Sequence, residues 1–561
     1  MFENVVCFEH LCLIFGVQYV IIDIYFIGGF AVMALDNSVK VPVPEHGAVK
    51  RRMGDKVYLY YATAVYRNEK GQPTCDRVSI GRFDEESEML IPNRNYYEVY
   101  LKQSAPVTAG FQSCGTYEAF RGICNKLGLT KLVKRYFPEH WEGMLTVAQY
   151  MLSQGNVMYY LKDYVEGHKT ALPDGIDDAA ISRMFSELRE EDRMLFFREW
   201  LKTKKPKEYV AYDVTSVSSY SKYIEDLEWG YNRDKEKLPQ INMGMYYGEE
   251  SGLPLYYRIY PGSISDKAHL KYMVSGNLLI DNSKTRFLMD RGFYSAENLR
   301  YLTEEGCRFI IALPGSLKYG TDLIKKHRDE IINHSEYRLG KGLPYGKAYE
   351  TTELGIRMNV HLFYDPEKAA MESEALYELV ERQENDLSQM EEPPEKKLHY
   401  DKYFYINRSK DGKLGYIRNF KAIDEQLAKC GFFLIAETDF RKTTAEILEL
   451  YRRRDVIEKS FDDLKNELDM KRLRCHNEET AQGKMFVAFL SLIVRSYMLK
   501  RLRPLMQQND YPFRKILMEL DKIHSFSMSP NAKPTPTNPL TKLQRTIFDC
   551  LDIPYPEDPC M

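Results

Sequence analysis

Three acidic residues in this chain have the type and placement that could support metal chemistry. Asp213 follows the apolar run YVAY, and Asp290 follows the run RFLM. Glu458 lies in YRRRDVIEKSFDDLK, which runs from Tyr451 to Lys465. Carboxylates on strand ends and a flanking helix can hold two divalent cations, which activate a nucleophilic oxygen and stabilise a leaving oxygen. Because all the ligands are oxygen atoms, they favour Mg²⁺ or Mn²⁺ over metals that prefer thiolates.

The run around Glu458 has helical spacing. Its polar members are separated by three, four and seven residues, which places them on one narrow stripe of a single helix. They are Tyr451, Arg454, Glu458 and Lys465, and a neighbouring apolar stripe contains Ile457, Phe461, Leu464 and Leu468. The pattern predicts one helix from about residue 443 that holds a carboxylate between two cations and a phenol. A solvated, charge-rich helix face has the same spacing, so the run alone leaves both interpretations open.

Short apolar runs predict the strands that must position the two aspartates. Strands are expected at residues 208–221, 241–247, 253–262, 286–290 and 308–315, with helices at 266–276 and from 295, and a later strand at 431–439. Asp213 and Asp290 then lie on the first and fourth of these strands. This order is typical of the first half of a mixed α/β sheet that has helices on its faces.

The remaining segments indicate several domains, as expected for 561 residues. A small β unit is expected at 36–105, a helical domain with possible DNA binding at 106–201, and the first half of the catalytic core at 202–315. Residues 316–430 are interpreted as an inserted subdomain, because structureless loops of that length are rare in compact domains. The second half of the core is expected at 431–500 and a helical, Pro-rich tail at 501–561, with MFVAFLSLIVRSYMLKRL as a buried core helix.

The N-terminal residues 1–35 contain an apolar run, residues 11–35, that is long enough to span a bilayer. Its one charge, Asp23, would cost about 2.5 to 3.5 kcal/mol at the centre of a membrane helix. No Lys or Arg precedes the run, as a signal peptide would require. The favoured interpretation is that translation begins at Met33 and the extension is spurious. A membrane anchor and a buried hydrophobic hairpin are the alternatives.

Composition places weaker limits on function. The formal net charge of −3 argues against an unusually basic nucleic-acid binder, although positive residues cluster locally, as in Arg452 to Arg454. The ten cysteines include no CxxC pair and no Cys/His zinc spacing. This usage fits a reducing, cytoplasmic setting.

In their order along the chain, the three acidic motifs resemble those of the insertion-sequence DDE transposases that carry the YREK signature. That signature is Tyr, two residues, Arg, three residues, Glu, six residues and Lys, and the run from Tyr451 to Lys465 matches it without a gap. YDVTS around Asp213 and MDRGFYS around Asp290 correspond to the first two acidic motifs. The resemblance covers about residues 40–500. In this family a β-rich insertion often precedes the Glu, which is similar to residues 316–430.

The resemblance implies an α/β fold with a ribonuclease H-like mixed sheet. It implies that Asp213, Asp290 and Glu458 are catalytic and bind two Mg²⁺ or Mn²⁺ ions. It also implies that Tyr451, Arg454 and Lys465 contact DNA at the transposon end. The reaction would be metal-dependent cleavage at the ends of the element, followed by attack of the freed 3′-hydroxyl on target DNA.

The partners implied are double-stranded DNA, as terminal inverted repeats and target DNA, and a second copy of the chain in a homodimeric synaptic complex. A cytoplasmic, nucleoid-associated protein of a bacterial or archaeal cell is expected, without a membrane partner. The alternative function is a catalytically inactive, DNA-binding transposase relic. His269 and Trp229 lie between the acidic motifs, and we interpret both as packing or local hydrogen-bonding residues.

Overall fold

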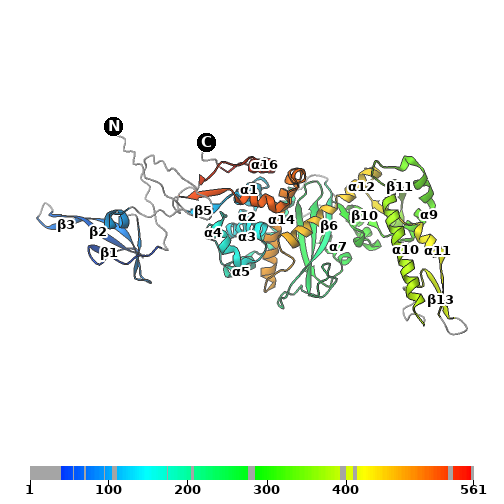
Figure 1. Ribbon diagram of the computed structural model, residues 1–561, viewed down its shortest axis with the longest axis horizontal. Helices are drawn as coiled ribbons and strands as arrows, with labels where there is room; N and C mark the ends of the chain where they lie inside the picture. The colour runs from blue at the N-terminus through cyan, green and yellow to red at the C-terminus, as the bar shows by residue number, and fades with distance from the viewer. Residues whose placement is uncertain are drawn as a thin grey trace. The chain divides into compact units, whose positions relative to one another are not determined.

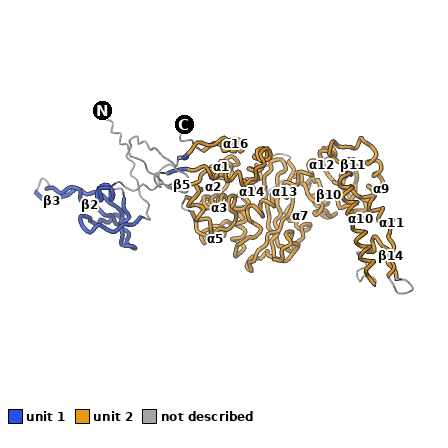
Figure 2. The backbone as a smooth tube through the Cα atoms, viewed as in Figure 1, with its two compact units in different colours: residues 1–111, 525–537 blue, residues 112–524, 538–561 orange. Residues whose placement is uncertain are grey.

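The computed structural model describes residues 39–556, except for 55, 68–70, 94, 104–109, 174, 204–207, 276–284, 392–399, 409–413 and 528–534. The interpretations of residues 1–35 therefore lie outside the described residues. No helix in the described part of the chain is both long and apolar enough to cross a membrane. The chain divides into two compact units, residues 1–111 with 525–537 and residues 112–524 with 538–561 (Figure 2).

The first unit is built on an antiparallel sheet of four strands. These are β1 (Ala48–Met53), β2 (Lys56–Arg67), β3 (Pro73–Asp84) and β4 (Met89–Pro92), in that order across the sheet. The β structure expected in this part of the chain is thus present. Leu59, Ile80 and Leu90 form its small core with Tyr96 of the π-helix η1 (Tyr96–Leu101). In the same unit, residues 525–526 of β16 (His524–Ser527) pair with β17 (Thr535–Pro536).

A helical region opens the second unit and packs around one buried helix, α14 (Glu478–Asn509) (Figure 1). Its helices are α1 (Gly115–Lys126), α2 (Leu129–Tyr136), α3 (Trp141–Gln154), α4 (Leu161–Gly167), α5 (Asp178–Glu187) and α6 (Glu190–Leu201), with a 3₁₀ turn η2 (Met158–Tyr160). Nearly every residue of the first half of α14 is buried, as expected for a helix that is apolar on all sides. This confirms the predicted core helix. The short helices α15 (Phe513–Asp521) and α16 (Lys542–Leu551) follow it.

An eight-stranded mixed sheet forms the centre of the second unit, with the order β11-β12-β15-β10-β9-β6-β7-β8. The strands are β6 (Val210–Ser218), β7 (Gln240–Gly248), β8 (Pro254–Pro261), β9 (Arg286–Met289), β10 (Arg308–Leu313), β11 (Tyr345–Thr351), β12 (Met358–Tyr364) and β15 (Phe432–Glu437). Strand β9 pairs in parallel with β6 and β10, and the other neighbours are antiparallel. The expected α/β fold class with a mixed sheet is confirmed.

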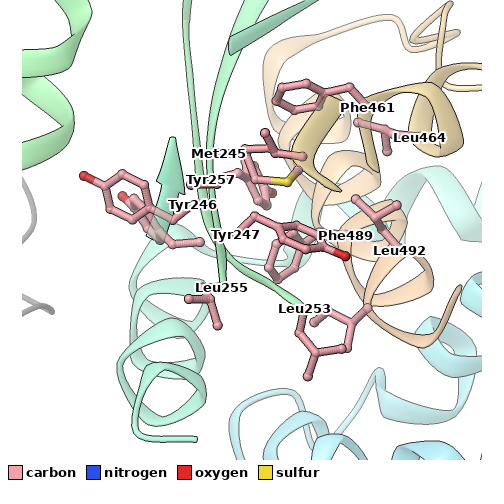
Figure 3. Packing of buried hydrophobic residues seen from close by; sticks show 14 of the residues in the cluster. Met245, Tyr246, Tyr247, Leu253, Leu255, Tyr257, Phe461, Leu464, Phe489 and Leu492 are labelled. Carbon is pink, nitrogen blue, oxygen red and sulfur yellow. The ribbon is translucent and has the colours of Figure 1, made fainter. Parts of the chain in front are cut away.

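Successive side chains of β7 alternate between the two faces of this sheet. Met245 and Tyr247 point toward the side where Phe461 and Phe489 lie, whereas Tyr246 points to the opposite side (Figure 3). The Tyr246 hydroxyl donates there to the carbonyl of Met273 in α7 (Asp266–Ser275), at 3.0 Å. Helix α7 is followed after β9 by η4 (Arg291–Phe293) and α8 (Ala296–Glu304).

The segment between β10 and β15 contains more than an insertion. Helix α9 (Lys318–Asn333) and the turns η5 (Ser335–Tyr337) and η6 (Glu353–Gly355) accompany β11 and β12, which belong to the main sheet. The elements between β12 and β15 are α10 (Pro366–Ser388), β13 (Phe404–Arg408), β14 (Leu414–Arg418) and α11 (Phe420–Leu427). They have an apolar cluster of their own, made of Leu376, Val380, Leu387, Tyr403, Phe404 and Ile423. The domain boundaries expected from the sequence remain predictions.

The prediction of a single helix from about residue 443 to Lys465 is wrong. Three elements replace it: α12 (Thr444–Arg452), α13 (Asp455–Asp462) and a π-helical turn, η8 (Asp463–Glu467). Helix α12 packs against β10 and β11, whereas α13 packs against β6 in the other half of the sheet. Because one straight helix cannot cover both halves, the chain turns at residues 453–454.

Candidate active site

Asp213 and Asp290 occupy equivalent positions on neighbouring parallel strands. Tyr212 of β6 is paired with Met289 of β9, so each aspartate is the next residue after that pair. Side chains alternate along a strand, and both carboxylates therefore point away from the face that holds Tyr212 and Met289. Asp213 is also opposite Met245, which faces α13 and α14 (Figure 3). The sheet register thus brings the two predicted aspartates together beneath α13.

Arg454 lies at the N-terminus of α13 and interacts with all three predicted carboxylates. Its guanidinium Nη2 is 2.8 Å from Oε1 of Glu458, and its side chain is only 12% exposed. Burial alone would lower the pKa of Arg454, but nearby Tyr451, Asp290, Glu458 and Asp213 outweigh burial and raise it. One buried cation therefore balances a group of acidic side chains that would otherwise repel each other.

The Asp213 carboxylate is the least compensated member of this group. Burial raises its pKa to about 6, and Glu458 adds to the increase. Two cations, Arg233 and Arg454, and the backbone N–H of Val214 oppose the shift. The N–H bond to Asp213 Oδ1 is 2.8 Å long, and Arg233 Nη2 lies 3.9 Å from the same oxygen. A buried carboxylate with so little local compensation would gain from an additional positive charge.

Tyr451 positions Asp290. Its hydroxyl donates to Asp290 Oδ1 at 3.3 Å, and burial raises the pKa of Tyr451 to about 12, so the hydroxyl stays protonated at neutral pH. The Arg454 guanidinium carbon lies 5.5 Å from the centre of the Tyr451 ring. Three members of the predicted signature, Tyr451, Arg454 and Glu458, are thus gathered around the aspartates despite the break between α12 and α13.

Lys465, the fourth member of the signature, makes its ion pair elsewhere. Its Nζ lies 2.7 Å from Oδ2 of Asp234, in the loop between β6 and β7, and its side chain is 9% exposed. Burial lowers the pKa of Lys465, although Asp234 partly offsets the effect. Lys465 lies within the π-helical turn η8, directly after the regular helix α13 that carries Glu458.

The donor atoms available around Arg454 suit a hard divalent cation, because all of them are carboxylate oxygens. Among the described residues, however, no three Asp, Glu, His or Cys side chains lie close enough together to hold a metal ion. Glu458 is half-exposed and paired with Arg454. The ligand types therefore fit a divalent metal, although Glu458 is paired with Arg454 and does not form a cluster with the two aspartates among the described residues.

Two further residues near the site had no signal in the sequence. Arg233 Nη2 lies 2.6 Å from Oδ2 of Asp266, at the start of α7, and so links that helix to Asp213. Both residues lie in ordinary charged stretches, so only their three-dimensional contacts identify them.

His269 is buried and stacked on Tyr260, with 3.4 Å between the ring centres, which confirms the packing interpretation. Burial lowers the pKa of His269 to about 3. The same interpretation is wrong for Trp229, which is 68% exposed.

Comparison with known families agrees with this arrangement. The family model described as "Transposase DDE domain" matches residues 204–494, a stretch that contains Asp213, Asp290 and Glu458. The chain therefore belongs to the DDE-domain family of transposases. No curated protein matched the sequence. Among solved structures, the chain is similar to a piggyBac transposase, determined by cryo-EM as a synaptic complex with hairpin DNA. The identity is 9% and the TM-score 0.34, over 79% of this chain and 83% of that one.

Proposed function

We propose that this protein is the DNA transposase of an insertion sequence, which cuts the ends of its element and joins the freed 3′-hydroxyl to target DNA. The observation that carries the proposal is the position of Asp213 and Asp290, each directly after the paired residues Tyr212 and Met289, with Arg454 and Glu458 beside them. The family match covers this whole arrangement.

Asp213, Asp290 and Glu458 are the proposed ligands of Mg²⁺ or Mn²⁺. Two such ions, when bound, would activate the attacking oxygen and stabilise the leaving oxygen of the phosphodiester. Tyr451 holds Asp290 in place through its hydroxyl. Arg454 balances the charge of these carboxylates, and its guanidinium would be able to bind a DNA phosphate at two points.

Lys465 would bind phosphate as a single point charge, after leaving Asp234. The proposed DNA substrates are the terminal inverted repeats and the target duplex. Because two ends must be cut and joined together, we propose a homodimer in the synaptic complex. The expected site of action is the nucleoid in the cytoplasm.

The proposal is tested by cleavage of DNA that carries the inverted repeats flanking the gene, with full-length protein and Mg²⁺. Asp290→Asn and Glu458→Gln should each slow cleavage by about 100-fold or more, because each removes a ligand from ions that contribute several kcal/mol to charge stabilisation. Binding to the repeats should be retained. Asp455→Asn is the matched control, since Asp455 is an exposed carboxylate on the same helix, and it should cut normally.

Two results would contradict the proposal. If either variant cleaves DNA at the wild-type rate, the residue that it replaces, Asp290 or Glu458, is not a metal ligand. Wild-type protein that binds the repeats but cuts nothing, even in Mn²⁺, would instead identify the inactive DNA-binding relic.

A further inference from the structure

The loop between β6 and β7, residues 219–239, exposes four aromatic side chains. Tyr220, Tyr223, Trp229 and Tyr231 are all mostly exposed, and Tyr231 is the most exposed of them, at 84%. Aromatic rings are normally at least partly covered, because they contribute large apolar areas to a core. Several exposed rings in one short loop therefore indicate a binding surface.

The backbone of this loop is held in place at several points. Asp234 pairs with Lys465, Arg233 pairs with Asp266, and the Asn232 amide donates to the Ser218 hydroxyl at 3.1 Å. A Cβ atom added to Gly230, between Trp229 and Tyr231, would lie 1.9 Å from the carbonyl oxygen of Gly262. Trp229 and Tyr231 thus lie on either side of a glycine whose backbone packs closely against Gly262, directly after β8, so the backbone between the two rings is held in place.

Cationic and aromatic groups from the segment after Glu458 contact the same loop. The Arg472 guanidinium carbon lies 5.5 Å from the centre of the Tyr220 ring. The His476 ring stacks on Tyr223, with 4.5 Å between ring centres and 22° between planes. Aromatic rings combined with arginine are the groups on which proteins stack unpaired nucleobases.

The charges on the loop nearly balance, because residues 219–239 contain five acidic and four basic side chains. The loop therefore has no excess of positive charge for a phosphate backbone, whereas its exposed rings can stack on the uncharged π-face of a base. The loop also reaches the candidate active site, because its Arg233 lies 3.9 Å from Asp213. A base bound here would belong to a nucleotide close to the phosphate held at the carboxylates.

We infer that residues 219–239 form a stacking surface for unpaired bases at the DNA end that the enzyme cuts, with Trp229 and Tyr231 as its main contacts. This inference rests on the proposed function. It implies a preference for DNA ends with unpaired nucleotides over fully paired ends, because bases within a duplex do not present their faces.

The test uses full-length protein and two DNA ends of the same sequence, one fully paired and one with unpaired thymidines at the cleavage position, at one fixed salt concentration. Trp229→Ala should weaken binding of the unpaired end by about 5- to 150-fold, the range for loss of one stacked base. Binding of the paired end should change by less than about 2-fold. Tyr555→Ala removes an exposed tyrosine near the C-terminus and is the control, with no change expected for either DNA.

Intrinsic fluorescence gives a second measurement, because the chain has only three tryptophans. Trp200 is buried and Trp141 is covered by Lys134, whereas Trp229 is exposed. The unpaired end should quench wild-type fluorescence, and Trp229→Phe should abolish the quenching while it retains a ring and near-normal binding.

The inference is overturned if Trp229→Ala weakens both DNA ends equally or neither, or if quenching persists in Trp229→Phe. Failure of the proposed function gives a different result, because the wild-type protein would then neither bind nor cut the inverted repeats. Cleavage by wild type without any preference for unpaired ends would reject the stacking surface alone.

Discussion

Asp213 of β6 and Asp439, which lies just after β15, have opposite electrostatic surroundings. Asp439 is paired with Arg308 and accepts a hydrogen bond from Tyr209 at 2.9 Å. Burial would raise the pKa of Asp439, but the Tyr209 bond and the cations Arg286 and Arg308 outweigh it and lower that pKa. For Asp213 burial dominates and raises the pKa to about 6. Asp439 thus stabilises the fold as a carboxylate, whereas ionised Asp213 destabilises the folded state, as expected for the metal ligand that we propose.

We predict that Asp213→Asn stabilises the metal-free protein at neutral pH. A rise of the folded-state pKa from 3.8 to about 6 corresponds to a penalty of about 3 kcal/mol for ionised Asp213. The folded protein holds this proton more tightly than the unfolded chain, so wild-type stability falls as the pH rises from about 4 to about 6. The gain in Tm of the variant should therefore be full above pH 6 and disappear near pH 4.

The control for this measurement is Asp439→Asn, which should have the opposite sign. It removes a buried carboxylate that is paired with the partly exposed Arg308, so the loss should approach the value of about 3 to 5 kcal/mol that is typical of a fully buried broken pair. Thermal unfolding in EDTA across this pH range measures both variants. Equal destabilisation by the two substitutions would contradict the difference between their environments.

At the scale of elements, the turn between α12 and α13 decides how the signature residues meet. Helix α12 begins with a capping box, in which the Thr443 hydroxyl accepts from the N–H of Glu446 and the Glu446 carboxylate accepts from the N–H of Thr443. This box fixes where α12 starts and hence where Tyr451 lies at its other end. Helix α16 has the same motif in Thr541 and Gln544.

The two capping boxes provide a matched pair of variants. Thr443→Ala and Thr541→Ala should each cost about 1 kcal/mol of stability, the usual effect of losing an N-cap. Only Thr443→Ala should also slow cleavage of the inverted repeats, because α12 carries the tyrosine that holds Asp290. Denaturant unfolding and the cleavage assay measure the two effects. An equal loss of cleavage in both variants would mean that the effect comes from global stability.

The elements show which parts of the site a sequence can predict. Asp213 and Asp290 are marked by the apolar runs that precede them, because buried strands leave a local signature. The break at residues 453–454 leaves none, because it depends on which half of the sheet each helix covers. The pairing of Lys465 with Asp234 and the contact of Arg233 with Asp213 join segments far apart in the chain. Trp229 is exposed next to Gly230, whose close approach to Gly262 is also a non-local contact.

At the scale of the second unit, the elements between β12 and β15 form an excursion from the main sheet. The chain leaves the sheet after β12 and returns to it at β15, close to where it left. Tyr364, the last residue of β12, is paired with Phe432, the first of β15. The N–H of Asp365 donates to the carbonyl of Gly431 at 2.9 Å. Because the excursion has its own apolar cluster, the main sheet does not depend on it for its core.

We predict that deletion of residues 366–430 leaves the sheet intact. It would join Asp365 directly to Gly431, so an Asp-Gly pair would connect the two strands, and this is a favoured two-residue hairpin loop. Gly431 already has a φ of 81°, which such a loop requires of its glycine. Thermal unfolding should remain cooperative, and hydrogen exchange should show β12 and β15 still protected.

The control is a deletion of residues 358–430, which also removes β12 from the sheet. It should abolish cooperative unfolding, because β11 would lose its neighbour. Loss of cooperative unfolding in the shorter deletion as well would show that the excursion is part of the main folding unit.

The near-closure at Asp365 and Gly431 also bears on how the chain reaches its fold. Pairing β12 with β15 in an unfolded chain means closing a loop of more than 60 residues, and the conformational entropy lost rises with loop length. If α10, β13, β14 and α11 form their own cluster first, the ends of that loop are already close together. A slow, long-range pairing step then becomes the addition of two neighbouring strands, so this excursion can guide folding of the sheet it interrupts.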